Sequence, residues 1–64
     1  MRHTEFWARL EQALGTAYAG SWADQVVLAE VGGRTAREAL EAGVAPRQVW
    51  VAVWRHLELP ANQR

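Results

Sequence analysis

The N-terminal part of the chain repeats apolar residues at the spacing of one helix face. These residues are Phe6, Trp7, Leu10, Ala13 and Leu14. Polar and charged residues occupy the opposite positions, and Gly15 follows, as glycine commonly does at the end of a helix. The pattern predicts a first helix near residues 5 to 14, with Thr4 as its N-cap.

A second apolar pattern extends from Trp22 to Val31. Ser21 and Asp24 resemble the capped start of a helix, and a double glycine follows the last apolar residue. The valines in this stretch also fit a strand. Because end signals occur on both sides, the sequence favours a second helix over residues 22 to 31.

The centre of the chain contains its strongest turn signal. Gly32 and Gly33 both permit a positive φ, and Thr35 is a favourable N-cap for a following helix. Gly43 then provides a typical helix end. The sequence therefore predicts a corner at the double glycine and a short third helix over residues 36 to 42.

A fourth helix is predicted from Pro46, which suits a first helical turn, to about Glu58. Its apolar arc comprises Val49, Trp50, Ala52, Val53, Trp54, His56 and Leu57. A strand is the competing interpretation, since valine and tryptophan favour strands. The segment has neither apolar-polar alternation nor a hairpin partner, so we predict a helix with Val51 on its outer side.

Two segments lack a sustained period. Residues 16 to 20 are expected to form a connector, with the ring of Tyr18 at the edge of the core. Residues 61 to 64, after Pro60, are expected to be a frayed C-terminal tail. Residues 1 to 60 would then form one domain.

These elements predict an all-α fold, a single small domain of four short helices with a helix-turn-helix-like C-terminal half. A chain of 64 residues has a small core, and its four tryptophans help to fill it. The chain contains no cysteine, so neither a disulfide nor a thiolate metal site contributes to stability.

Charge and hydropathy narrow the classes of function. Seven basic residues, all arginine, balance seven acidic residues, which disfavours strong nonspecific binding to nucleic acid. No apolar run approaches the roughly 20 residues that cross a bilayer, and the N-terminus does not resemble a signal peptide. We expect a cytoplasmic protein without membrane contacts.

No constellation of residues indicates catalysis. His3 and His56 are the only histidines, and no further ligands stand at metal-binding spacing. Ser21, Asp24 and His56 are the residue types of a hydrolase triad, but no nucleophile elbow surrounds the serine. The sequence predicts a protein that is not an enzyme and has no metal or cofactor.

The candidate binding residues lie mainly in the C-terminal half. In a helix-turn-helix, Arg47, Trp50, Val51 and Trp54 would face the major groove of DNA, but three of these four are apolar. Trp50, Val51 and Trp54, rimmed by Arg47 and Arg55, have instead the composition of a protein-protein hot spot. The alternative that both tryptophans fill the core stays open.

Two arginines near the corner complete the candidates. Arg34 precedes a helix N-cap, where a cation gains nothing from the helix dipole, so it needs another partner. That partner is either Glu30, Glu38 or nearby carbonyls, or an external acidic surface. The expected partner-binding residues are therefore Arg34, Arg37, Arg47, Trp50, Val51, Trp54 and Arg55.

Residues throughout the chain carry a family resemblance. They include Met1-Arg2, Phe6-Trp7, Tyr18-Ala19, Gly32-Gly33-Arg34-Thr35, Glu38-Ala39-Leu40, Ala42-Gly43 and Val49-Trp50. The chain resembles a family of small actinobacterial proteins of unknown function, whose genes often lie near those of the recombinase RecA and its regulator RecX. The resemblance implies a setting in DNA repair or recombination and implies no activity.

These observations favour a small noncatalytic protein-interaction module whose partner is another protein. The alternative is a helix-turn-helix-like protein that binds nucleic acid. A homodimer is compatible with both interpretations.

Overall fold

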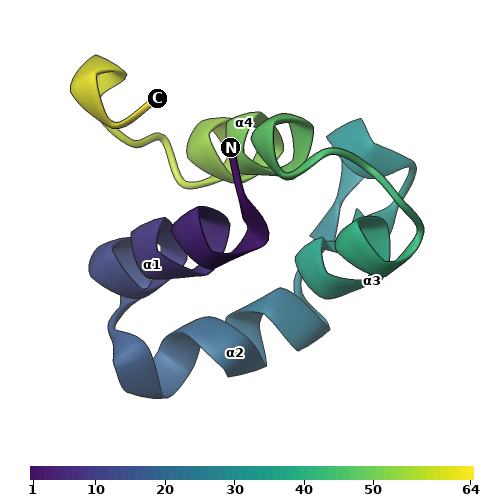
Figure 1. Ribbon diagram of the computed structural model, residues 1–64, viewed down its shortest axis with the longest axis horizontal. Helices are drawn as coiled ribbons and strands as arrows, with labels where there is room; N and C mark the ends of the chain where they lie inside the picture. The colour runs from purple at the N-terminus through teal and green to yellow at the C-terminus, as the bar shows by residue number, and fades with distance from the viewer.

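Four α-helices surround one core in the computed structural model, which describes residues 1–64 (Figure 1). The helices are α1 (His3–Leu14), α2 (Thr16–Gln25), α3 (Ala36–Glu41) and α4 (Pro46–His56). Between α2 and α3 lie strands β1 (Val27–Leu28) and β2 (Arg34–Thr35), joined through the 3₁₀ helix η1 (Ala29–Val31). A second 3₁₀ helix, η2 (Ala61–Gln63), follows α4. The predicted helical class with four short helices is confirmed.

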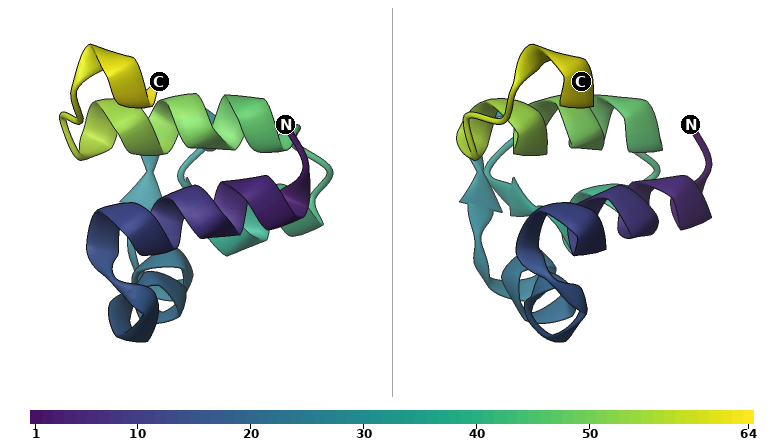
Figure 2. Two further views of the ribbon diagram at one scale, coloured as in Figure 1. Left: turned by 60° about the vertical axis from the view of Figure 1, so that its left-hand side comes forward. Right: turned by 90° about the vertical axis from the view of Figure 1, so that its left-hand side faces the viewer.

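Each helix packs on the next one along the chain, and α4 also contacts α1, so the helices form a closed ring (Figure 2). The ring of Phe6 on α1 meets Trp50 on α4 edge-on, with 6.1 Å between ring centroids. Ala36 and Ala39 are fully buried on α3, and their small side chains let this short helix approach its neighbours closely. None of the helices has the length and apolar character needed to cross a membrane.

The second helix begins earlier than predicted. It covers Thr16–Gln25 rather than residues 22 to 31, so the predicted connector is its first half. Gly20 lies inside the helix, where glycine is only about 1 kcal/mol less favourable than alanine. Ser21 is therefore not an N-cap, and its hydroxyl instead accepts a hydrogen bond from the Gln25 side chain. Tyr18 is 55% exposed and does not enter the edge of the core.

The second helix also ends earlier than predicted, because the valines after it adopt an extended backbone. Val26 has φ −88° and ψ 122°, a conformation that β-branched residues favour. The next two residues pair in antiparallel register with the segment beyond the double glycine, Val27 with Thr35 and Leu28 with Arg34. The strand that the sequence analysis weighed against a helix is therefore present at two residues.

The double glycine forms a corner, as predicted, but it joins two strands instead of two helices. Gly32 and Gly33 have φ values of 77° and 73°, a region that favours glycine. The Gly33 N–H donates to the main-chain oxygen of Leu28 at 3.2 Å and closes the loop. The corner thereby places η1 beside α4.

Thr35 caps α3 as predicted. Its hydroxyl oxygen accepts a hydrogen bond from the Glu38 main-chain N–H at 3.2 Å, and the Glu38 carboxylate accepts one from the Thr35 N–H at 2.9 Å. This reciprocal capping box satisfies two N–H groups at the start of the helix. Gly43, with φ 95°, follows the end of the helix.

Replacing Thr35 by valine is expected to destabilise the domain by about 1 kcal/mol, because valine keeps the shape of the side chain and removes the capping acceptor. Thr35 is only 6% exposed, so water cannot fully replace the lost acceptor. Thermal unfolding followed by circular dichroism measures the effect. Thr35→Ser, which keeps the hydroxyl, is the control, and equal destabilisation by both variants would contradict the capping role.

The fourth helix begins at Pro46 as predicted and ends at His56 instead of Glu58. The chain turns at Glu58, which is the only non-glycine residue with a positive φ, at 54°. The Leu59 N–H donates to the main-chain oxygen of Trp54 at 3.1 Å across this turn. The turn directs the following residues back along α4.

The residues predicted to be a frayed tail pack on the outer side of α4 (Figure 2). We call residues 60–64 the C-terminal strap. The Trp54 indole N–H donates to the main-chain oxygen of Pro60 at 2.8 Å, and the Trp50 indole N–H donates to that of Gln63 at 2.9 Å. These hydrogen bonds to the strap are accepted by its main chain. The polar side chains of the strap therefore contain no sequence pattern from which its packing on α4 could be predicted.

Candidate binding groove

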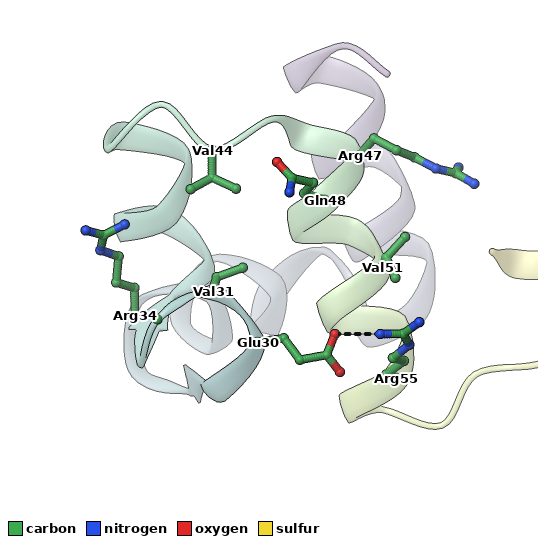
Figure 3. Close-up of a pocket in the computed structure, with 9 residues that line it drawn as sticks. Glu30, Val31, Arg34, Val44, Arg47, Gln48, Val51 and Arg55 are labelled. Atoms are coloured by element: carbon green, nitrogen blue, oxygen red, sulfur yellow. Dashed lines mark hydrogen bonds and ion pairs between the residues drawn. The ribbon is translucent and has the colours of Figure 1, made fainter.

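An open groove of about 560 Å³ lies between the corner and α4 (Figure 3). Its lining includes three valines and three arginines: Val31, Val44, Val51, Arg34, Arg47 and Arg55. Glu30, Gly32 and Gln48 complete it. The groove thus combines aliphatic surface with guanidinium groups, and it is built from η1, β2, α4 and the loop between α3 and α4.

The periodicity of α4 places its contribution on one side of the helix. Arg47, Val51 and Arg55 follow one another at intervals of four residues and so share a face. The opposite face is buried in the core, with Val49, Trp50, Ala52 and Val53 between 0% and 3% exposed. Because that face packs in the core, the face with Arg47, Val51 and Arg55 lines the groove.

One ion pair spans the groove. Nη1 of Arg55 on α4 lies 3.0 Å from Oε2 of Glu30 on η1 (Figure 3). Both side chains are about half exposed, at 54% and 45%, so this pair contributes at most about 1 kcal/mol. Arg55 can therefore exchange Glu30 for an external carboxylate at little cost.

Arg34 has no partner within the molecule. It takes part in none of the three ion pairs. The two carboxylates predicted as its partners are engaged elsewhere, Glu30 with Arg55 and Glu38 with the N–H of Thr35. The guanidinium of Arg34 is thus exposed at the rim of the groove and free to bind an external anion.

The groove is a cationic patch on a chain without net charge. Its three arginines and one glutamate give a formal charge of +2, whereas the whole chain has a formal charge of zero. The remainder of the chain therefore has a formal charge of −2. An acidic ligand is attracted to this patch and disfavoured by the rest of the surface.

The groove brings together part of the surface expected from the sequence. Arg34, Arg47, Val51 and Arg55 line it. The other three expected residues, Arg37, Trp50 and Trp54, do not.

Arg37 on α3 contacts residues of both α1 and α2 on another side of the domain. Its guanidinium lies over the ring of Trp7 on α1, 4.7 Å from the centroid, and pairs with the carboxylate of Asp24 on α2. Because its charge and its planar face are both engaged, Arg37 is better explained as a packing residue than as a binding residue.

The expected patch of two tryptophans around Val51 does not form. Trp50 is 1% exposed in the core, and Trp54 lies half-buried under the strap, where the guanidinium of Arg64 sits 5.4 Å from its ring. Val51 instead lines the groove (Figure 3). The helix turns about 100° per residue, so neighbouring positions cannot share one face.

Five groove residues were not among the candidates from the sequence: Glu30, Val31, Gly32, Val44 and Gln48. Gln48 could have been found from its place beside Arg47 on the outer face of the helix. Val31 ends η1 and reaches α4 only through the folded corner, whereas Val44 lies in the loop between α3 and α4.

The fold and the groove define a small helical domain with one cationic, valine-lined surface. A model of the family described as a protein of unknown function, DUF3046, matches residues 1–62. The chain belongs to this family. No curated protein and no solved structure matches the chain.

Proposed function

We propose that the chain is a small noncatalytic protein-interaction module, and that its groove binds an acidic segment of a partner protein. The observation that carries this proposal is a groove in which three valines lie between the unpaired Arg34 on one side and Arg47 and Arg55 on the other (Figure 3). Carboxylates bind guanidinium groups through paired, charge-assisted hydrogen bonds. Aliphatic side chains between the carboxylates would pack on the valines.

The dimensions of the groove support a short segment as its ligand. A volume of about 560 Å³ is within the range of small binding sites and accommodates a few side chains. The formal charge of +2 matches an acidic segment, and the half-exposed side chain of Arg55 is accessible to it. The partner best suited to this surface alternates Asp or Glu with Leu, Ile or Val.

The biological setting of this proposal comes from the family resemblance. The resemblance implies DNA repair or recombination, so we propose that the acidic segment belongs to a protein of that process. This part of the proposal depends on the resemblance and not on the groove.

Replacing Arg34 by alanine is expected to weaken binding of a labelled peptide of alternating glutamate and leucine about tenfold. The melting temperature should stay nearly unchanged, because the Arg34 side chain takes part in no ion pair within the molecule. Fluorescence anisotropy measures the binding, and circular dichroism measures the melting. The control is Arg2→Ala, which removes an equal charge from an exposed position outside the groove. Equal weakening by both variants would show that net charge, not the groove, drives binding.

The outer face of α4 supports nucleic-acid binding as a second candidate. In the helix-turn-helix-like half formed by α3 and α4, this face carries Arg47, Gln48, Val51 and Arg55, and Arg and Gln are residue types that read base edges. Titration of labelled duplex DNA at low salt separates the candidates. Binding that weakens steeply with salt would favour the second.

A further inference from the structure

The hydrogen bonds that hold the C-terminal strap are all accepted by its main-chain oxygens. Besides the two indole donors, the guanidinium groups of Arg9 and Arg47 donate to the main-chain oxygen of Arg64, at 3.2 Å and 2.9 Å. No side chain of the strap accepts any of these hydrogen bonds. Apart from the guanidinium of Arg64 over the Trp54 ring, the strap is bound to α4 through main-chain acceptors, and an alternative acceptor can compete for their donors.

Arg47 belongs to both the strap and the groove. Its stem lines the groove on α4, whereas its guanidinium extends away from Val44 and Val31 (Figure 3) and reaches Arg64. The strap thus keeps the guanidinium of Arg47 outside the groove. This guanidinium is one of three that belong to residues lining the groove. Arg9 holds the same oxygen from α1 but does not line the groove.

We propose that the strap is an autoinhibitory contact, in which Arg64 and an acidic ligand in the groove compete for Arg47. This inference rests on the proposed function of the groove. A ligand carboxylate binds guanidinium through charge-assisted hydrogen bonds and so competes with the oxygen of Arg64 for the same donor. The strap, however, is present at high effective concentration because it is part of the same chain. The strap therefore lowers the affinity of the groove for acidic segments, and their binding loosens the strap.

Loosening of the strap changes the surroundings of two indole groups. Without the strap, the N–H groups of Trp50 and Trp54 lose their acceptors at Gln63 and Pro60. The turn at Glu58, a non-glycine residue at φ 54°, marks where the strap leaves α4 and can move. Ligand binding in the groove therefore changes the surroundings of both indole groups on the other side of α4. The half-buried Trp54 becomes more exposed.

Variants of the full chain test the competition. Arg9→Ala removes one donor to the strap without touching the groove, so it should strengthen binding of the glutamate-leucine peptide about threefold to tenfold. Loss of the Arg9 charge alone would weaken binding of the acidic peptide. Tighter binding by Arg9→Ala therefore cannot result from the change in net charge. The control is Glu5→Gln, which removes the ion pair of Arg9 at Glu5 and leaves the strap contact intact. Its affinity should change only by the small gain expected from one lost negative charge, and by less than that of Arg9→Ala.

Indole resonances in a ¹H–¹⁵N spectrum test the coupling directly. During titration with the same peptide, the Trp50 and Trp54 indole signals should move together with the groove amides of Val44 and Gln48. The indole signals of Trp7 and Trp22 serve as an internal reference, since the strap does not bind them.

The outcomes distinguish this inference from the proposed function. Movement of the groove amides without the two indole signals, and unchanged affinity of Arg9→Ala, would overturn the autoinhibitory contact and leave the groove as a binding site. If neither set of signals moves, the proposed function fails and the inference fails with it. Joint movement with tighter binding by Arg9→Ala supports both.

Discussion

Replacing Trp50 by alanine is expected to leave the domain largely unfolded at room temperature. Trp50 is 1% exposed, contacts Phe6 edge-on and donates its indole N–H to the strap. Truncation of a buried aromatic residue to alanine removes about 3–5 kcal/mol. A domain of 64 residues has a total stability of about 3–10 kcal/mol, so this loss is of the same order. Urea unfolding followed by far-ultraviolet circular dichroism measures it.

Trp54→Ala is the matched control for this variant. Trp54 lies one helical turn further along α4 and is half-buried under the strap, outside the buried core cluster. Its truncation should lower the stability clearly less than that of Trp50. If the two variants had equal effects, the core would not be centred on Trp50 as the structure indicates.

Replacing Gly33 by valine is expected to destabilise the domain by about 1–3 kcal/mol. Gly33 has φ 73°, and a Cβ atom placed there would meet no atom within 4 Å. The expected loss is therefore backbone strain, because a β-branched residue is strongly disfavoured at positive φ. Thermal unfolding measures it, with a lower melting temperature as the expected result.

Two further variants separate backbone strain from other effects at glycine. A D-alanine at Gly33, introduced by chemical synthesis, favours positive φ and should not destabilise the domain. Gly20→Ala, inside α2, should stabilise it by about 0.5–1 kcal/mol, because Gly20 has an ordinary helical backbone. An unchanged melting temperature for Gly33→Val would mean that the corner does not need a glycine at this position.

The sequence predicted three of the four helices well, because their signals are local, although α1 begins at His3 with Arg2, not Thr4, as its N-cap. The capping box at Thr35, the glycine ends and Pro46 act within a few residues of their own positions. The start of the second helix was predicted wrongly, because Gly20 resembles the end of one segment and Ser21 resembles the N-cap of a new helix. Ala19, Trp22 and Ala23 form one buried face in the structure, and this tertiary burial carries the helix through Gly20.

The candidate site was predictable only where it follows helical periodicity. Arg47, Val51 and Arg55 form a stripe of four-residue spacing that the sequence displays, and all three line the groove. The exposure of Trp54 was not predictable, because it depends on a main-chain oxygen of the strap. Val31 reaches the groove only through pairing of the strands around the corner.

If an acidic segment binds in the groove between the corner and α4, the glutamate-leucine peptide should contact the residues that line it. Main-chain amide shifts recorded during titration with this peptide map the contact. We predict that the largest shifts occur at Val31, Arg34, Val44 and Gln48, and that Tyr18 and Ser21 on the exposed side of α2 remain unchanged. Shifts centred on α2, or shifts spread evenly over the domain, would contradict the assignment of the groove as the binding site.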